Sequence, residues 1–225
     1  RLVQRRSTWS SPTRPQGVSL GQAASVPTGS RCAGHSTLSL RCIAAYRWGM
    51  SSRRPVHTHS PLVEEADSTW AGRAEAGHGG RARVAPVRRV VALLRAELTE
   101  EPLSVDARWR LMRALYFAGE YASSGEAEAK SCFLEATRVA GESLSLLRAR
   151  AQEGSSRDLS RSTPVDLVPR LAGDGEAAAA FAWGGVAWGM YALAEGIFAA
   201  AREGVAARIR DHAEAALWLS LALDD

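Results

Sequence analysis

Acidic residues are missing from the start of this 225-residue sequence, because residues 1–63 contain no aspartate or glutamate. Lysine is almost absent as well: Lys130 is the only one, and arginine supplies nearly all the positive charge. Residues 1–90 carry 14 basic and 4 acidic side chains, a net charge of +10, whereas residues 91–225 carry 14 basic and 20 acidic, a net charge of −6. Two parts so different in charge are not expected to form one packed unit.

The sequence also lacks the usual signatures of enzymes and metal sites. It has no phosphate-binding loop, dinucleotide fingerprint or nucleophile elbow. Its three cysteines, Cys32, Cys42 and Cys132, do not form the even set of a disulfide framework, and the nearby histidines do not give zinc-finger spacing. His212 follows Asp211 on an expected helix without a nucleophile nearby, and we interpret it as a solvated histidine. We therefore expect no enzymatic activity, no catalytic or metal-binding residues and no cofactor.

Residues 1–84 are expected to be an arginine- and serine-rich arm without regular structure. No window keeps a helical or strand period, and the segment has too little apolar surface to offset its ordering entropy. Three interpretations stay open. The composition is typical of an organellar transit peptide. The arginines would also suit binding to nucleic acid or an anionic membrane through counterion release. The interpretation we favour is that residues 1–49 are translated sequence upstream of a native start at Met50.

A helical pattern begins at Pro86, and residues 85–225 are expected to form an all-α domain. Apolar residues recur at helical spacing from Val87 to Leu98, and no stretch alternates in the manner of a strand. Ser104 is placed to cap the second helix, whose apolar stripe has arginines between its members. The later helices are expected at about 126–139 (with Gly141 as C-cap), 143–151, 163–171, 176–201 and 205–223.

Several of these helices carry residues typical of a tetratricopeptide repeat. That repeat uses large rings to fill the wedge between helix pairs and small residues where antiparallel helices approach closely. Four half-matches occur in the expected order: Trp109, Met112 and Tyr116; Ala129, Phe133 and Ala136; Phe181, Gly184, Gly185 and Trp188; and Ala213 with Leu217. They predict tetratricopeptide-like antiparallel helix pairs, arranged as a superhelix or a bundle.

The segment FAWGGVAWGMYA at residues 181–192, which includes Trp183 and Gly189, is the most specific feature. Followed by AAREGVA and IRDHA, it resembles the TatT component family of TRAP transporters. Residues 109–121 are similar to that family's early helix, and the resemblance covers roughly residues 106–225.

This resemblance implies a non-catalytic accessory protein of the periplasm or cell envelope that binds a periplasmic solute-binding protein. The family continues with further helices, so the chain is expected to be a fragment truncated at its C-terminus. We hypothesise a helical-repeat scaffold with a protein partner; self-association stays open, and no ligand-binding residues are assigned. No nucleic-acid binding is expected of residues 85–225. The alternative is a binder of nucleic acid or anionic membrane that acts through the arm.

A membrane span was considered for residues 177–194, which carry no charge. Alanine and glycine fill 11 of these 18 positions, and Trp183 and Trp188 would lie in the middle of the bilayer instead of at an interface. We interpret the segment as the central helix of a bundle, with Gly184, Gly185 and Gly189 allowing neighbouring helices to come close. No transmembrane helix is expected.

Overall fold

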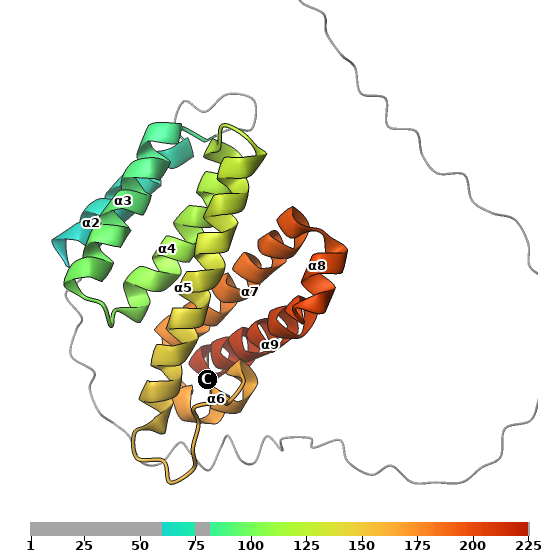
Figure 1. Cartoon of the computed structure of the whole chain (residues 1–225). Helices are drawn as coiled ribbons and strands as arrows, with labels where there is room; N and C mark the ends of the chain where they lie inside the picture. Colours follow the sequence, from blue (N-terminus) through green and yellow to red (C-terminus); the bar gives the residue numbers. More distant parts are fainter. Residues whose placement is uncertain (1–59, 75–81, 225) are drawn as a thin grey trace, which may run out of the picture. The chain divides into compact units, whose positions relative to one another are not determined.

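Eight α-helices make up the part of the chain that the structure, a computed structural model, describes: residues 60–74 and 82–224 (Figure 1). The helices are α2 (Pro61–Ala71), α3 (Val84–Glu100), α4 (Val105–Phe117), α5 (Glu126–Gln152), α6 (Pro164–Leu171), α7 (Gly175–Glu195), α8 (Ile197–Arg202) and α9 (Val205–Asp224). A 3₁₀ turn, η2 (Gly72–Ala74), follows α2, and a π-helical turn, η3 (Ala118–Ala122), extends α4. No β-strand occurs among the described residues, so the predicted all-α class is confirmed.

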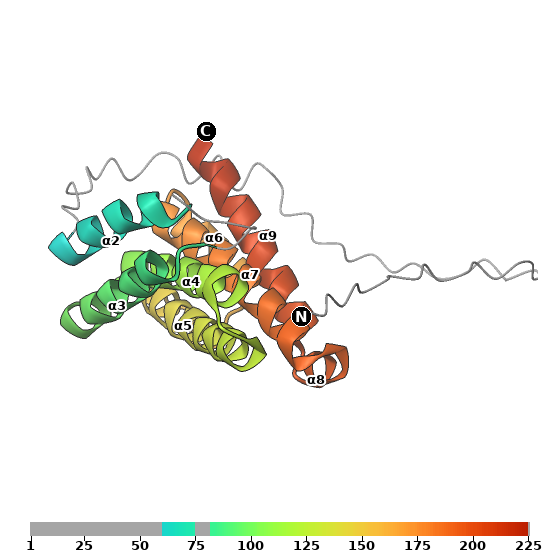
Figure 2. The ribbon, with the colours of Figure 1, turned by 90° about the horizontal axis from the view of Figure 1, so that it is seen from above.

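The helices pack on neighbours in the sequence and also, chiefly through α7, on helices that are not adjacent in the chain. Helix α2 packs on α3, α3 on α4, and α4 on both α5 and α7. Helix α7 also packs along α5 and α9, and α6 lies against α5 and α9. Figure 2, viewed from above, shows α4 and α7 in the middle of this arrangement, flanked by the other long helices. These two helices therefore lie at the centre of the shared core.

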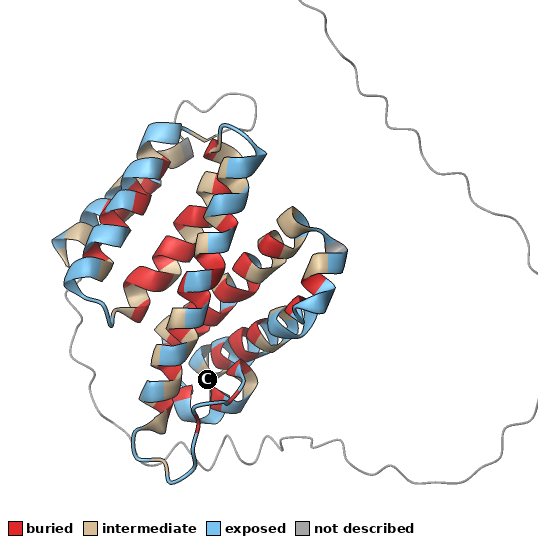
Figure 3. Ribbon diagram, viewed as in Figure 1, coloured by how far each residue is buried: buried red, intermediate tan, exposed pale blue. Residues whose placement is uncertain are grey.

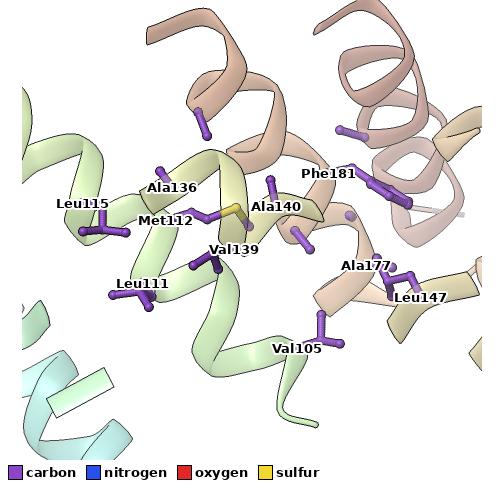
Figure 4. Packing of buried hydrophobic residues seen from close by; sticks show 14 of the residues in the cluster. Val105, Leu111, Met112, Leu115, Ala136, Val139, Ala140, Leu147, Ala177 and Phe181 are labelled. Carbon is purple, nitrogen blue, oxygen red and sulfur yellow. The ribbon is translucent and has the colours of Figure 1, made fainter. Parts of the chain in front are cut away.

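The core combines aliphatic side chains on α3, α4 and α5, alanines on α5 and α7, and the rings of Trp70 and Phe181. Buried residues lie on the facing sides of these helices (Figure 3). The central cluster contains Val105, Leu111, Met112, Leu115, Ala136, Val139, Ala140, Leu147, Ala177 and Phe181 (Figure 4). Small side chains on α5 and α7 let the helix axes come close, and each fully buried leucine or phenylalanine contributes about 1.5–3 kcal/mol through removal from water.

Helix α2 lies inside the segment expected to lack regular structure, so that prediction is wrong for residues 60–74. The hydroxyl of Ser60 accepts a hydrogen bond from the backbone N–H of Val63 at 3.3 Å, and Pro61 occupies the first turn. Val63, Ala66 and Trp70 then form a buried stripe against α3 and α4. The helical domain thus includes residues before the predicted boundary at 85. Residues 1–59 and 75–81 of the expected arm lie outside the described part.

Two predicted helix boundaries are also wrong. The expected helices at 126–139 and 143–151 are one continuous helix, α5, and Gly141 lies within it instead of capping it. The buried stripe continues without interruption through Val139, Ser143 and Leu147, so packing on α7 outweighs the roughly 1 kcal/mol helix cost of a glycine. The expected helix at 176–201 is divided instead, because Gly196, with φ of 90°, ends α7 and begins α8.

Three further boundaries agree with the predictions, and each has a local signal in the sequence. Ser104 accepts a hydrogen bond from the backbone N–H of Ala107 at 3.0 Å and begins α4. Thr163 and Asp166 form a capping box at the start of α6. Gly204, with φ of 66°, separates α8 from α9.

Among the described helices, α7 alone has the length and mean hydropathy, 1.3, that fit a membrane span. In the structure 44% of an apolar 18-residue stretch of α7 is buried, and α7 contacts α4, α5 and α9. Length and composition of this kind are shared by membrane spans and by the central helices of bundles.

Candidate functional site

Tryptophan and arginine side chains alternate across α2, η2 and α4. The guanidinium carbons of Arg73 and Arg113 lie 4.3 and 4.4 Å from the ring centre of Trp70. Arg113 also lies 5.1 Å from the ring of Trp109, on which Arg110 stacks at 4.3 Å. The contact order is therefore Arg73, Trp70, Arg113, Trp109, Arg110, and we name this set the tryptophan–arginine stack. Such cation–π contacts contribute about 0.5–2 kcal/mol each, with the larger values in desolvated positions.

Helical spacing explains how short sequences supply the stack. Trp70 and Arg73 are three residues apart, and Trp109 and Arg113 are four apart, so each pair lies on one helix face. The indole N–H of Trp109 donates to the Asp106 carboxylate at 3.1 Å, which fixes the ring in the first turn of α4. The stack therefore joins α2 to α4 through side chains that are held in place at both ends.

The stack carries more positive than negative charge. The Nε of Arg110 donates to both oxygens of Asp67, at 3.2 and 3.1 Å, and Arg110 also pairs with Asp106. Arg113 reaches Asp67 at 3.5 Å, and its pKa is lowered by burial, with the charges of Arg110 and Arg73 acting in the same direction and Asp67 opposing. Arg110 and Arg113 thus share Asp67, Arg110 also pairs with Asp106, and Arg73 donates to the Trp70 carbonyl oxygen at 3.0 Å. The Nε atoms of Arg73 and Arg113 are buried without a hydrogen-bond partner in the described structure.

Aromatic rings extend the stack from α4 to α7. Trp70 meets Phe117 edge to face, with ring centres 4.7 Å apart, and Phe117 contacts Tyr121 at 5.1 Å. Tyr116 lies 6.1 Å from Tyr121 and 6.0 Å from Trp183 of α7. Trp109, Tyr116 and Trp183 are half-buried. We name the tryptophan–arginine stack together with Tyr116, Tyr121 and Trp183 the aromatic–arginine surface.

The π-helical turn η3 places Tyr121 in this surface. Within the turn, Gly119 lies against the ring of Phe133, so a methyl group added there would come within 2.5 Å of the ring atom Cε1. The hydrogen bond with Tyr121 raises the pKa of Tyr116, and burial acts in the same direction. π-helical turns are rare and occur often at functional sites.

The residues predicted as repeat-packing positions divide into three groups. Met112, Phe133, Ala136, Phe181, Gly184 and Gly185 are buried, as expected. Trp109, Tyr116, Ala129, Trp183, Trp188 and Gly189 are half-buried. Ala213 and Leu217 are exposed, Leu217 by 57%, so the prediction that they face the core is wrong.

His212 explains why α9 presents a different face from the one predicted. Its imidazole is only 4% exposed, its Nδ1 lies 2.8 Å from the Arg208 carbonyl oxygen, and its ring meets Phe181 edge to face at 5.8 Å. Burial lowers the pKa of His212, against the opposing influences of the Arg208 carbonyl and Asp211. The interpretation of His212 as a solvated residue is wrong. The inward face of α9 therefore runs through Val205, His212, Ala215, Ala216 and Leu219.

Trp188 belongs to a second, smaller cluster where α7, α8 and α9 meet. Its ring meets Tyr191 edge to face at 5.9 Å, and the guanidinium of Arg208 lies 4.3 Å from its centre. The Tyr191 hydroxyl donates to the Glu203 carboxylate at 2.9 Å, and this hydrogen bond raises the pKa of Tyr191. Nothing lies within 4 Å of a methyl group added to Gly189, so the expectation of a close approach at that glycine is wrong.

Within residues 60–74 and 82–224, no group of three His, Cys, Asp or Glu side chains lies close enough to hold a metal ion. Comparison with protein-family models, curated proteins and solved structures gives no match.

Proposed function

We propose that this protein is a non-catalytic helical scaffold that binds a protein partner through the aromatic–arginine surface. The observation that carries the proposal is the half-exposed alignment of Trp109, Arg113, Tyr116 and Trp183 along α4 and α7. Tryptophan, tyrosine and arginine are the residues that dominate binding energy at protein interfaces. Here they are already stacked on one another, so binding would immobilise few additional rotamers.

The packing of the helices supports a tetratricopeptide-like arrangement for this scaffold. Three helix pairs, α2 with α3, α4 with α5, and α7 with α9, follow one another, and α4 contacts α7 across adjacent pairs. The first helices of the three pairs, together with the turns η2 and η3, then supply the aromatic–arginine surface. Stacked helix pairs commonly use an extended face of this kind for binding. The inserted helices α6 and α8 distinguish this chain from a regular array.

The charge of the surface defines the chemistry of the partner. In the tryptophan–arginine stack, Arg73, Arg110 and Arg113 outnumber the carboxylates of Asp67 and Asp106 by one, while the negative charge of Glu120 acts on Tyr116. An acidic, partly apolar surface on the partner would complement the stack. By resemblance to the TatT component family, the partner is the periplasmic solute-binding protein of a TRAP transporter.

Calorimetric titration with the purified solute-binding protein of a TRAP operon from the same genome tests this proposal. Trp109→Ala and Tyr116→Ala should each weaken binding by about 30-fold or more, the effect of losing an interface hot spot. Trp218→Ala is the matched control, because Trp218 is a 39% exposed tryptophan on α9, outside this surface. The proposal is wrong if the wild-type chain shows no binding, or if the three variants bind equally well.

The arginine-rich start of the chain supports a second candidate function, binding to nucleic acid or an anionic membrane. The specific observation is the absence of any acidic residue from residues 1–63. Affinity for a polyanion should then fall steeply with salt, because binding releases counterions. Comparing heparin retention of the whole chain with that of residues 60–225 tests it. Equal retention of the two would rule out the arm as the binding element.

A further inference from the structure

A small polar pocket is lined by residues of α3, α4 and α5. It takes no part in the aromatic–arginine surface. Its volume is about 200 Å³, and its polar lining includes Arg95 and Thr99 of α3, Arg108 of α4, and Glu135, Arg138 and Glu142 of α5. Sites for drug-sized molecules usually have volumes of about 300–1,000 Å³. This pocket therefore suits a smaller ligand.

The carboxylates of the pocket are already engaged at its walls. Glu135 accepts two hydrogen bonds from Arg95, at 2.9 and 2.5 Å, in a bidentate pair that joins α5 to α3. Glu142 pairs with Arg138 one turn before it on α5. Three guanidinium groups thus line a pocket with two carboxylates, which leaves one positive charge in excess.

Arg108 carries this excess charge. Its side chain is 9% exposed, and its Nε is buried without a hydrogen-bond partner in the described structure. One terminal nitrogen donates to the Ser104 carbonyl oxygen at 3.0 Å, and the Glu142 carboxylate, which Arg138 shares, stays 3.9 Å from Nε. Burial lowers the pKa of Arg108, the charge of Arg138 lowers it further, and Glu142 opposes both. A buried guanidinium with so distant a counter-charge lacks an acceptor that an anion would supply.

We propose that this pocket binds a small oxyanion, such as sulfate, phosphate or a carboxylate, through the guanidinium groups of Arg108 and Arg138. Guanidinium groups present N–H donors in a fork that matches two oxygens of such an anion. The anion would neutralise the excess charge and give the guanidinium of Arg108 a closer counter-charge than Glu142, at 3.9 Å, provides. It would also bind among side chains of α3, α4 and α5, and so stabilise the contacts of these three helices.

Isothermal titration of the whole chain with sodium sulfate, against sodium chloride at equal ionic strength, tests the proposal. Sulfate is the first probe because it does not titrate near neutral pH; phosphate and acetate then separate a preference for tetrahedral oxyanions from one for carboxylates. The expected result is saturable binding of at least one of these anions with Kd of about 1 mM or tighter. Absence of saturable binding for all three overturns the proposal.

Four variants connect the binding to the pocket. Arg108→Leu and Arg138→Gln should weaken binding by about 10- to 100-fold, the effect of losing a charge-assisted hydrogen bond. Glu142→Gln should tighten it, because it removes the carboxylate that competes for both arginines. Arg88→Gln is the matched control, since Arg88 also joins α3 to α5, at Glu128, but lies outside the pocket.

Unchanged affinity in Arg138→Gln, or weaker binding in Glu142→Gln, overturns the proposal. These two side chains are 61% and 41% exposed, so the test stands even if Arg108→Leu fails to fold. The substituted residues lie outside the aromatic–arginine surface, so failure of this pocket leaves the proposed protein-binding function intact, and the reverse holds as well.

Discussion

The backbone of Gly184 lies against the imidazole ring of His212, so that a methyl group added to Gly184 would come within 2.6 Å of the ring atom Cδ2. Gly185, the next residue of α7, faces α9 at ordinary contact distance: its methyl group would lie 3.5 Å from Cβ of His212 and 3.8 Å from the backbone nitrogen of Ala213. Helices α7 and α9 therefore require a glycine at one of the two positions.

This contact predicts opposite effects for two neighbouring substitutions. Gly184→Ala should destabilise the protein by about 1–3 kcal/mol, because the buried His212 ring must move. Gly185→Ala should be neutral or stabilise by up to about 1 kcal/mol, because alanine favours the helix and the space admits its methyl group. Urea unfolding of both variants measures the difference. In a His212→Ala background the cost of Gly184→Ala should shrink, and equal costs in both backgrounds would contradict the contact.

His212 also predicts how stability depends on pH. Its pKa is lower in the folded protein than the ordinary value of 6.5, so the unfolded chain takes up a proton first as pH falls. The stability is therefore fully present above pH 6.5 and is lost below it, with a slope of at most about 1.4 kcal/mol per pH unit. Unfolding by urea between pH 5 and 8 measures this slope, and His212→Gln should reduce it.

Two carboxylates with lowered pKa values act outside this pH window. Hydrogen bonds from Ser124 lower the pKa of Glu128 to about 2, and those from Ser160 lower the pKa of Asp158 as well. Both groups contribute stability that is lost only at more acidic pH. If His212→Gln and the parent lose stability equally between pH 6.5 and 5, the buried histidine is not responsible.

The parts of this fold that depend on local signals could be predicted from the sequence. The parts that depend on residues distant in the chain could not. Ser104 and Gly204 mark helix ends in the sequence, and both mark them in the structure. Gly141 carries the same kind of signal, yet the surrounding stripe on α5 packs without interruption and overrides it. Helix α2 buries three apolar residues, Val63, Ala66 and Trp70, and Trp70 packs against Arg113, more than 40 residues away.

The candidate surface, too, could be predicted from the sequence only in part. Trp109 and Tyr116 were identified from their spacing, but periodicity assigns the arginines between them to solvent. In the structure Arg110 is 8% exposed because Trp109 and Asp67 surround it, and Asp67 comes from another helix. The sequence contains no local signal for such a partner.

Truncation tests the revised domain boundary. A chain of residues 60–225 keeps α2, whereas a chain of residues 85–225 loses Val63 and Trp70 from the core and Ser60 as the partner of the buried Glu97. Loss of these two buried side chains alone should cost about 3–6 kcal/mol. Thermal unfolding followed by circular dichroism should show a clearly lower Tm for the shorter chain. Equal Tm values would mean that α2 adds nothing to the domain.

Two leucine substitutions can test which face of α9 packs against α7. Both sides of this helix are apolar: Ala213 and Leu217 lie on one, and Ala215 and Leu219 on the other, so periodicity alone cannot choose between them. In the structure Leu219 is fully buried and Leu217 is 57% exposed. Leu219→Ala should therefore cost about 2–5 kcal/mol, and Leu217→Ala about 0.5 kcal/mol or less. Chemical denaturation of the two variants, which remove the same atoms from one helix, compares them directly. A larger loss for Leu217→Ala would show that α9 packs through the face predicted from the repeat pattern, and that His212 does not set its orientation.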